Sequence, residues 1–236
     1  ITNLAEIYFN YLKRVEKDGG SFHNFLSFTE KVLDAEGSED SIGRAIWSLG
    51  ELSQKHPDTS IKNEAKEILE RANLDKHLEH QHLRAKAFIL LGLLASHEQR
   101  QATPWLEAII KQYESNSRPK WSWYEDGLYY ANGVIPYSLA RYGHKRNHKR
   151  ALDIAEESLI WLDQQSRHDG VPAPIGQDGW FKFGQRRALY DQQPLEAANM
   201  VLSWSELYRS SQKPEHLQKA LEWFDWYHGN DLLGVS

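Results

Sequence analysis

The sequence predicts an all-α protein, because apolar residues recur with the spacing of a helix along most of its 236 residues. The first stripe consists of Leu4, Ile7, Tyr8, Tyr11 and Leu12. A second stripe begins at Ile42, and Ser38 or Ser41 is a suitable N-cap for it. No stretch shows the apolar–polar alternation of a strand. We expect nine helices, over residues 2–16, 41–55, 60–73, 83–95, 104–115, 132–142, 147–163, 194–209 and 214–228.

The order of these helices predicts how they are layered. Amphipathic helices with a charged face alternate with helices that are apolar on most sides, and the pattern repeats about every 43 residues. Such an order is typical of a ring of helical hairpins, in which one helix of each pair lines the centre. An irregular bundle and an open solenoid remain alternatives. We expect the inner helices to be those at 41–55, 83–95, 132–142 and 194–209.

Composition excludes several classes of function. A formal net charge of -5 argues against a nucleic-acid-binding surface, which would be basic. The longest apolar run, at 87–95, is far shorter than the roughly 20 residues of a membrane span. The absence of cysteine excludes disulfides and thiolate chemistry. No signal peptide is visible, although a leader could precede Ile1, and a cytoplasmic location is expected.

Two prolines locate the starts of inner helices. Proline is tolerated only in the first turn of a helix, because it lacks an N–H group and clashes with the preceding turn. Pro136 therefore indicates a helix that begins near Asn132, with Asn132 as its N-cap. Pro194 is a natural first residue of the next inner helix.

Acidic residues stand at the start of three inner helices. They are Glu39 and Asp40, Glu125 and Asp126, and Asp191. If the inner helices are parallel in a ring, these carboxylates converge at one end of its axis. Glycoside hydrolysis requires such a group, in which one carboxyl is held neutral and another is ionised. The alternative for each acid alone is an N-cap or a partner of the helix dipole.

Aromatic side chains near these acids favour a carbohydrate cleft, because flat rings stack on sugar faces. The sequence has nine Trp and eleven Tyr, several of them in polar, Gly-rich segments. The segment 166–184 is too long for an ordinary helix connection, and we expect it to carry Trp180, Phe181 and Phe183 over the cleft. The candidate sugar-binding residues are Arg44, Trp123, Tyr124, Tyr130, Trp180, Tyr190, Gln192 and Gln193.

Asp126 and Asp191 are the first candidates for the catalytic acid and base, with Glu125, Glu39 and Asp40 as further candidates. Arg44 follows Asp40 by one helical turn and can hold its carboxylate or meet a substrate hydroxyl. The segment HLEHQH at 77–82 is a possible metal site, but a solvated turn is favoured because no third ligand is placed. No cofactor or metal is expected.

Several motifs together resemble one family of proteins. They are GSEDSIGRAIWSLG, WYEDGLYYANGVIPYSLARYG, GQDGW, YDQQPLEAANM and WFDWYHGNDLLG, in this order. The set resembles a bacterial and archaeal group of six-hairpin, (α/α)6-toroid glycosidase-like proteins, often found beside or fused to glycosyltransferases. The resemblance implies a toroid with a sugar site at the N-terminal ends of its inner helices, and a glycosyltransferase domain as a possible partner.

The resemblance also implies an incomplete ring. The chain supplies about four to five hairpins of the six, so we expect residues 1–236 to form a single all-α domain that is the central part of a larger one. The expected function is glycoside hydrolysis of an oligosaccharide by carboxylate acid/base catalysis. The alternatives are a non-catalytic carbohydrate-binding domain that accompanies a glycosyltransferase, and a sugar isomerase or lyase with His23 as its base. Whether the protein is an enzyme stays open at this point.

Overall fold

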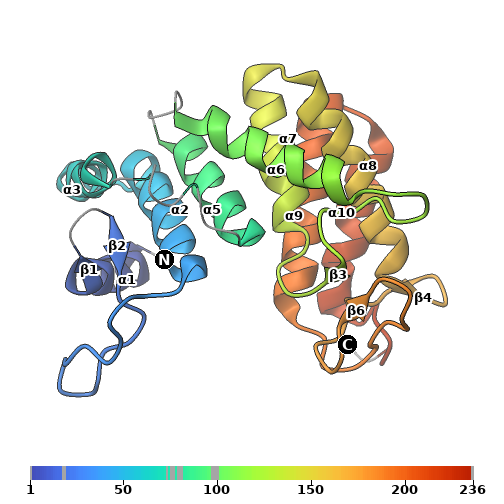
Figure 1. The fold of residues 1–236 in the computed structure, drawn as a ribbon, viewed down its shortest axis with the longest axis horizontal. Helices are drawn as coiled ribbons and strands as arrows, with labels where there is room; N and C mark the ends of the chain where they lie inside the picture. The colour runs from blue at the N-terminus through green and yellow to red at the C-terminus, as the bar shows by residue number, and fades with distance from the viewer. Residues whose placement is uncertain are drawn as a thin grey trace. The chain divides into compact units, whose positions relative to one another are not determined.

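The computed structural model describes residues 2–17, 20–72, 74, 78, 82–96 and 101–234, and it confirms the all-α prediction, with 62% helix (Figure 1). All nine expected α-helices are present in these residues. They are α1 (Thr2–Val15), α2 (Glu39–Lys55), α3 (Thr59–Arg71), α5 (Leu83–Ala95), α6 (Ala102–Asn116), α7 (Val134–Arg146), α8 (Lys149–Gln165), α9 (Pro194–Ser211) and α10 (Pro214–Phe224). A short 3-10 helix, η2 (Asp225–His228), follows α10.

The strands are two residues long and belong to the loops. They pair antiparallel as β1 (Glu16–Lys17) with β2 (Ser21–Phe22), β3 (Gly127–Leu128) with β6 (Phe181–Lys182), and β4 (Arg167–His168) with β5 (Val171–Pro172). The β3–β6 pair joins the loop before α7 to the long loop between α8 and α9.

The chain forms two compact units, Ile1–Trp105 and Leu106–Ser236. In the N-terminal unit, α2 and α5 are parallel neighbours, since Gly43 lies against Ala85 and Gly50 lies against Gly92. A Cβ atom on Gly50 would stand 2.3 Å from the carbonyl oxygen of Gly92, so glycine allows the close approach of the two backbones. Helix α5 is buried on nearly all sides, as its uniform apolar sequence predicts.

The apolar stripe that predicts α1 is not its buried face. Leu4, Ile7 and Tyr8 are more than half exposed, at 57%, 55% and 67%. The α1 side chains that enter the core are Phe9 and Val15, each 1% exposed. The stripe therefore predicts the helix correctly but predicts the wrong face of it as buried.

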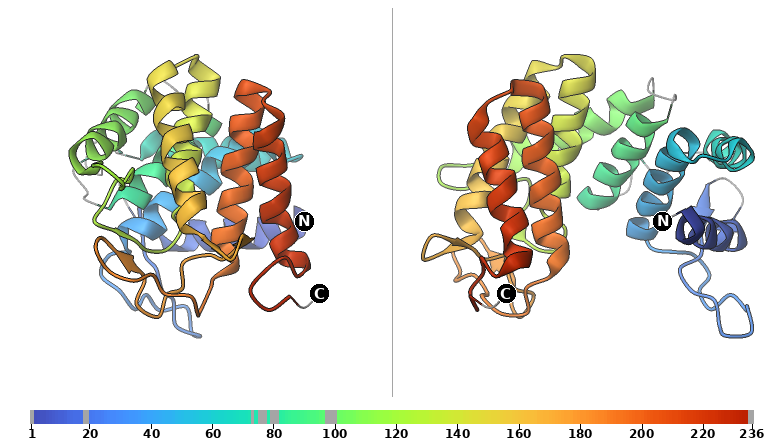
Figure 2. Two further views of the ribbon diagram at one scale, coloured as in Figure 1. Left: turned by 90° about the vertical axis from the view of Figure 1, so that its right-hand side faces the viewer. Right: turned by 180° about the vertical axis from the view of Figure 1, so that it is seen from behind.

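In the C-terminal unit, α7 with α8 and α9 with α10 form two antiparallel hairpins packed side by side (Figures 1 and 2). Helices α7 and α9 are parallel neighbours, because Gly133 lies against Asn199 and, three turns along, His144 Nδ1 lies 2.7 Å from Glu206 Oε1. The loop before α7, the long loop between α8 and α9 and the segment after α10 gather at one end of the unit (Figure 2). The residues with predicted sugar chemistry in this unit lie in these loops.

The helix starts agree with the sequence in two of three places. Ser38 is the N-cap of α2, where its Oγ accepts from the Ser41 N–H at 3.3 Å, and Pro194 is the first residue of α9. The prediction for Asn132 is wrong, because Gly133 holds the N-cap position of α7. The Asn132 Oδ1 atom instead accepts from the backbone N–H of Tyr129 at 3.0 Å.

Parallel inner helices occur within both units, as a ring of hairpins requires, while closure into a toroid and the single-domain assignment stay predictions. Among the described helices, none combines the length and the hydropathy that a bilayer crossing requires. Most of the segment at 77–82, including His77 and His80, lies outside the described residues.

Candidate functional site

The loop end of the C-terminal unit contains a cleft of about 310 Å³, which we call the Tyr190 cleft. One wall is the segment 189–192 before α9, and the other is η2 with the segment that follows it. The lining residues are Leu189, Tyr190, Asp191, Gln192, Trp226, Asp231, Leu232 and Leu233. Tyr190 is 77% exposed, so its ring is available to a ligand. Three predicted site residues, Tyr190, Asp191 and Gln192, therefore share one cleft.

The first wall is held by backbone and amide hydrogen bonds. Gln177 N donates to the carbonyl of Asp191 at 3.2 Å, and Gln192 Nε2 donates to the carbonyl of Leu189 at 2.8 Å. Gly176 lies so close to Tyr190 that a Cβ atom would stand 1.7 Å from the Tyr190 carbonyl oxygen. Asp191 itself has a left-handed backbone, with φ of 57°, which is uncommon for a residue other than glycine.

The second wall supplies another carboxylate and an indole. Asp231 Oδ1 accepts from the backbone N–H groups of Leu233 and Gly234, at 2.8 and 2.9 Å. Trp226 Nε1 is shielded from water and has no hydrogen-bond partner among the described residues. Tyr227 packs edge-on against Trp226 at 5.2 Å, and its hydroxyl donates to the carbonyl of Pro194. This last bond ties the second wall to the first residue of α9.

Asp126 does not line the Tyr190 cleft. Its side chain is exposed, and Oδ1 accepts from the Tyr129 hydroxyl at 3.1 Å. Its carbonyl accepts from Phe183 N at 2.8 Å, beside the β3–β6 pair. Glu125 is half-buried, and its carbonyl accepts from Trp121 Nε1 at 2.7 Å. The two first-choice acids, Asp126 and Asp191, therefore do not meet in this cleft.

Two of the predicted sugar platforms are core residues, and this part of the prediction is wrong. Trp123 and Tyr124 are both 0% exposed. Trp123 stacks on Trp161 at 5.8 Å, and the Tyr124 hydroxyl is 2.8 Å from Ser158 Oγ. Burial raises the pKa of Tyr124 far above its ordinary value, so this hydroxyl stays neutral. Both rings are covered by α8 and cannot stack on a ligand.

The remaining predicted aromatics and amides lie at the surface or partly below it. Tyr130 and Trp180 are half-buried, and Trp180 meets Tyr129 edge-on at 6.3 Å. Gln193 is also half-buried and donates to Gln177 Oε1 at 2.8 Å. Phe181 and Phe183 each pack edge-on against Trp121 at 5.3 Å. The aromatic residues of the long loop thus anchor it to the segment between α6 and α7.

Glu39, Asp40 and Arg44 belong to the N-terminal unit. Arg44 Nε donates to Asp40 Oδ2 at 2.6 Å, which confirms that Arg44 holds this carboxylate. Glu39 Oε2 accepts from the backbone N–H of His82 at 3.2 Å. His23, the candidate base of an isomerase, has its Nδ1 4.0 Å from Asp34 Oδ1. Convergence of all three acidic helix starts on one axis stays a prediction.

A buried carboxylate that the sequence does not predict joins α7 to α9. Glu196 is 5% exposed, and its oxygens accept from the backbone N–H groups of Ala131 and Asn132. Oε2 also accepts from Asn132 Nδ2 at 3.1 Å. The carboxylate therefore satisfies N–H groups of the two residues before the N-cap of α7, near the helix end where the dipole favours a negative charge. Its place in the first turn of α9 would suggest a cap for α9, so spacing alone gives no signal for this contact.

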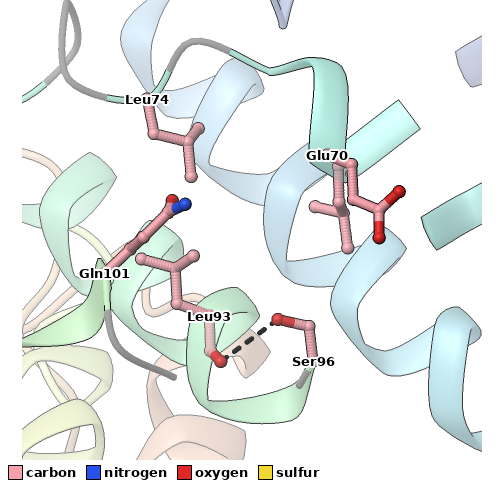
Figure 3. A pocket seen from close by; sticks show the side chains of 6 residues that line it. Glu70, Leu74, Leu93, Ser96 and Gln101 are labelled. Atoms are coloured by element: carbon pink, nitrogen blue, oxygen red, sulfur yellow. Dashed lines mark hydrogen bonds between the residues drawn. The ribbon is translucent and has the colours of Figure 1, made fainter. Parts of the chain in front are cut away.

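A separate cavity in the N-terminal unit has about 80 Å³ and contains none of the predicted site residues (Figure 3). Leu74 and Leu93 point into it, and Ser96 Oγ donates to the carbonyl of Leu93 at 3.2 Å. Its size suits one or two water molecules rather than a sugar.

The described residues contain no group of three His, Asp or Glu side chains placed to hold a metal ion. Comparison with known proteins adds no identification. No protein-family model matches the sequence, and no curated protein matches it as a relative. The resemblance to six-hairpin glycosidase-like proteins accordingly stays a prediction that rests on the quoted motifs.

Proposed function

We propose that this protein binds an oligosaccharide in the Tyr190 cleft. The observation that carries the proposal is the set of groups in one cleft: an exposed tyrosine ring, two carboxylates and an amide. A tyrosine face suits the C–H face of a sugar ring, while carboxylate and amide groups suit its hydroxyls. The volume of about 310 Å³ accommodates one or two sugar rings.

We further propose hydrolysis as the reaction. Asp191 and Asp231 come from separate walls of the cleft, so a glycosidic bond can lie between them. One carboxyl would donate its proton to the glycosidic oxygen as the C–O bond breaks, and the other would attack the anomeric carbon or activate water. Asp231 replaces Asp126 as the proposed partner of Asp191, because Asp126 does not line the cleft.

One observation favours binding without hydrolysis. Asp231 Oδ1 accepts two backbone N–H bonds and so stabilises the turn 231–234. A carboxylate with this structural role has one oxygen left for a substrate. A binding domain that accompanies a catalytic partner, such as a glycosyltransferase, is therefore the second candidate.

Binding and product formation can be tested separately. The chain would be screened against a glycan array, and the glycans that bind would be incubated with it and analysed by mass spectrometry and NMR. We expect Tyr190→Ala to weaken binding by about two- to tenfold, since a ring contact contributes roughly 0.5–1.5 kcal/mol. Asp191→Asn and Asp231→Asn should abolish cleavage and largely preserve binding.

Asp126→Asn is the matched control, because this aspartate is exposed and does not line the cleft. Loss of cleavage in Asp126→Asn and not in Asp231→Asn would assign the acid pair differently. If glycans bind without any product, and Asp191→Asn and Asp231→Asn bind them with wild-type affinity, the second candidate, a non-catalytic binding domain, is supported. Wild-type binding by Tyr190→Ala would exclude the Tyr190 cleft as the sugar site.

A further inference from the structure

The opposite end of the C-terminal unit contains a second cleft, of about 390 Å³, where the α7–α8 and α9–α10 turns meet. Its lining includes Lys149, Glu156, Ser210, Ser211, Lys213 and His216, and we call it the Ser211 cleft. Ser211 is the last residue of α9 and is exposed, while His216 in α10 is only 4% exposed. A serine that solvent can reach therefore stands beside a shielded imidazole.

Three of these side chains form a continuous hydrogen-bonded chain. Ser211 Oγ lies 2.9 Å from His216 Nδ1, and His216 Nε2 lies 3.1 Å from Glu156 Oε1. Glu156 also accepts from the Lys213 ammonium group, which keeps its charge balanced. The Trp204 ring lies 5.4 Å from the imidazole and covers it from the interior of the unit.

The protons in this chain follow from the chemistry of its members. An ionised carboxylate only accepts hydrogen bonds, so the Nε2 atom of His216 carries the hydrogen that faces Glu156. The Nδ1 atom of neutral imidazole then has a free lone pair, and the Ser211 hydroxyl donates to it. The Lys213 backbone N–H donates to Ser211 Oγ at 3.2 Å, which fixes the hydroxyl and leaves it a second lone pair.

We propose that Ser211 is a nucleophile for acyl transfer, with His216 as its general base and Glu156 as the group that orients His216. The expected substrate class is a small carboxylic ester. Nucleophile, base and orienting acid within hydrogen-bond reach define such a constellation by geometry rather than by fold. In the familiar Ser–His–Asp arrangement Nε2 faces the serine and Nδ1 faces the acid, whereas here Nδ1 faces Ser211 and Nε2 faces Glu156. An imidazole can accept a proton at whichever nitrogen carries none, so Nδ1 can serve as the base.

The proposed reaction is balanced with water as the second substrate. Ser211 Oγ forms a bond to the acyl carbon while its proton moves to His216 Nδ1. The C–O bond of the ester then breaks, and the same proton leaves with the alcohol. Water repeats the sequence on the acyl-serine, which releases the carboxylic acid and restores the hydroxyl. Lys149, which lines the same cleft, supplies positive charge for the oxyanion that forms in each step.

The test is covalent labelling of the full chain with a fluorophosphonate probe, followed by peptide mass spectrometry, and turnover of p-nitrophenyl acetate. We expect the probe on Ser211 and loss of both signals in Ser211→Ala. Ser210→Ala is the matched control, because Ser210 is the neighbouring serine of the same cleft. Glu156→Gln should slow labelling by about 10²–10⁴-fold, since an amide can no longer hold His216 in the correct tautomer.

A purely structural role of these residues gives a different result. His216→Asn can affect folding because His216 is buried, so labelling rates would be compared only among variants with the circular dichroism spectrum of the wild type. Absence of labelling on Ser211 in the folded wild type would overturn the proposal, as would equal rates in wild type and Glu156→Gln. The sugar proposal concerns another cleft and is unaffected by either outcome.

Discussion

The carboxylates of the C-terminal unit occur in two settings that differ in burial and in partners. Asp163 and Glu196 are 4% and 5% exposed, and several donors surround each of them. Asp191 and Asp231 line the Tyr190 cleft, where Asp191 is exposed and Asp231 is half-buried. Removing a buried charge from its partners destabilises a protein strongly, whereas an exposed charge contributes little to stability and stays available to a ligand. The comparison separates acids that hold the fold from acids that can serve a substrate.

Asp163 lies where α8, α10 and the β4–β5 turn meet. Its oxygens accept from Arg167 at 2.9 and 3.0 Å, from Lys219 at 3.1 Å and from Trp223 Nε1 at 2.7 Å. Burial alone would raise the pKa of Asp163, but the hydrogen bonds of Arg167 and Trp223, with the charges of Arg167 and Lys219, outweigh it and lower the pKa.

The largest expected effect is that of Asp163→Asn. We expect the free energy of unfolding to fall by about 3–5 kcal/mol near neutral pH, because Arg167 and Lys219 would lose a buried counter-charge. Urea unfolding of both proteins over a range of pH would measure it. Since the folded pKa is lowered, this stabilisation is complete above the unfolded pKa of about 3.9 and disappears as the pH falls through the folded value. The difference between the two proteins should therefore narrow in acid.

Asp153→Asn is the control for this experiment, because Asp153 is an exposed acid on the same helix. We expect it to change the free energy of unfolding by less than about 0.5 kcal/mol. An equal loss in the two variants would mean that Asp163 has no special role.

Glu196→Gln should have the next largest effect. The amide keeps one acceptor oxygen but turns an NH₂ group toward N–H donors at the start of α7 and removes the charge that the helix dipole favours. We expect a loss of about 1.5–3 kcal/mol in the free energy of unfolding, the usual contribution of hydrogen bonds to a charged group. Glu215→Gln, an exposed acid in the first turn of α10, is the control.

If Glu196→Gln lowers the free energy of unfolding by no more than Glu215→Gln does, the division into buried structural acids and exposed acids is contradicted. It would show that the α7–α9 junction tolerates loss of this charge, and that burial does not identify a structural acid there.

Sequence patterns predicted the helices well, because helix periodicity is local. The helix predicted over residues 83–95 is α5, with the same bounds. Eleven of its thirteen residues are buried, which matches a segment that is apolar on nearly all sides. The errors involve contacts between distant segments. Asn132 has the residue type of an N-cap, but its backbone N–H and its Nδ2 atom donate to Glu196, which is 64 residues later in the sequence. Trp123 and Tyr124 stand beside polar residues in the sequence, and they are core residues because α8 and Tyr113 of α6 pack against them.

The same reason explains what the sequence showed of the candidate sites. Tyr190, Asp191 and Gln192 are neighbours in the sequence and were predicted together. Asp231 joins them in the Tyr190 cleft from 40 residues away; it lies within the quoted motif WFDWYHGNDLLG, but nothing in that motif places it beside Asp191. The chain of Ser211, His216 and Glu156 spans α8 to α10 and has no counterpart in any local motif.

The smallest expected effect concerns the charge of the sugar. Asp191 and Asp231 are the charged residues that line the Tyr190 cleft, so an anionic sugar would meet like charge and an amino sugar opposite charge. Ion pairs between exposed charges contribute roughly 0.2–1 kcal/mol, and salt weakens this contribution further. Among β-1,4-linked oligomers of glucose, protonated glucosamine and glucuronate, we expect affinity to be highest for glucosamine and lowest for glucuronate. Calorimetry at low and high salt would measure the order, which should collapse in Asp191→Asn/Asp231→Asn and persist in Asp126→Asn. Tight binding of the glucuronate oligomer would mean that these carboxylates do not face the sugar. Exposure in the cleft would then not identify Asp191 and Asp231 as acids that serve a ligand.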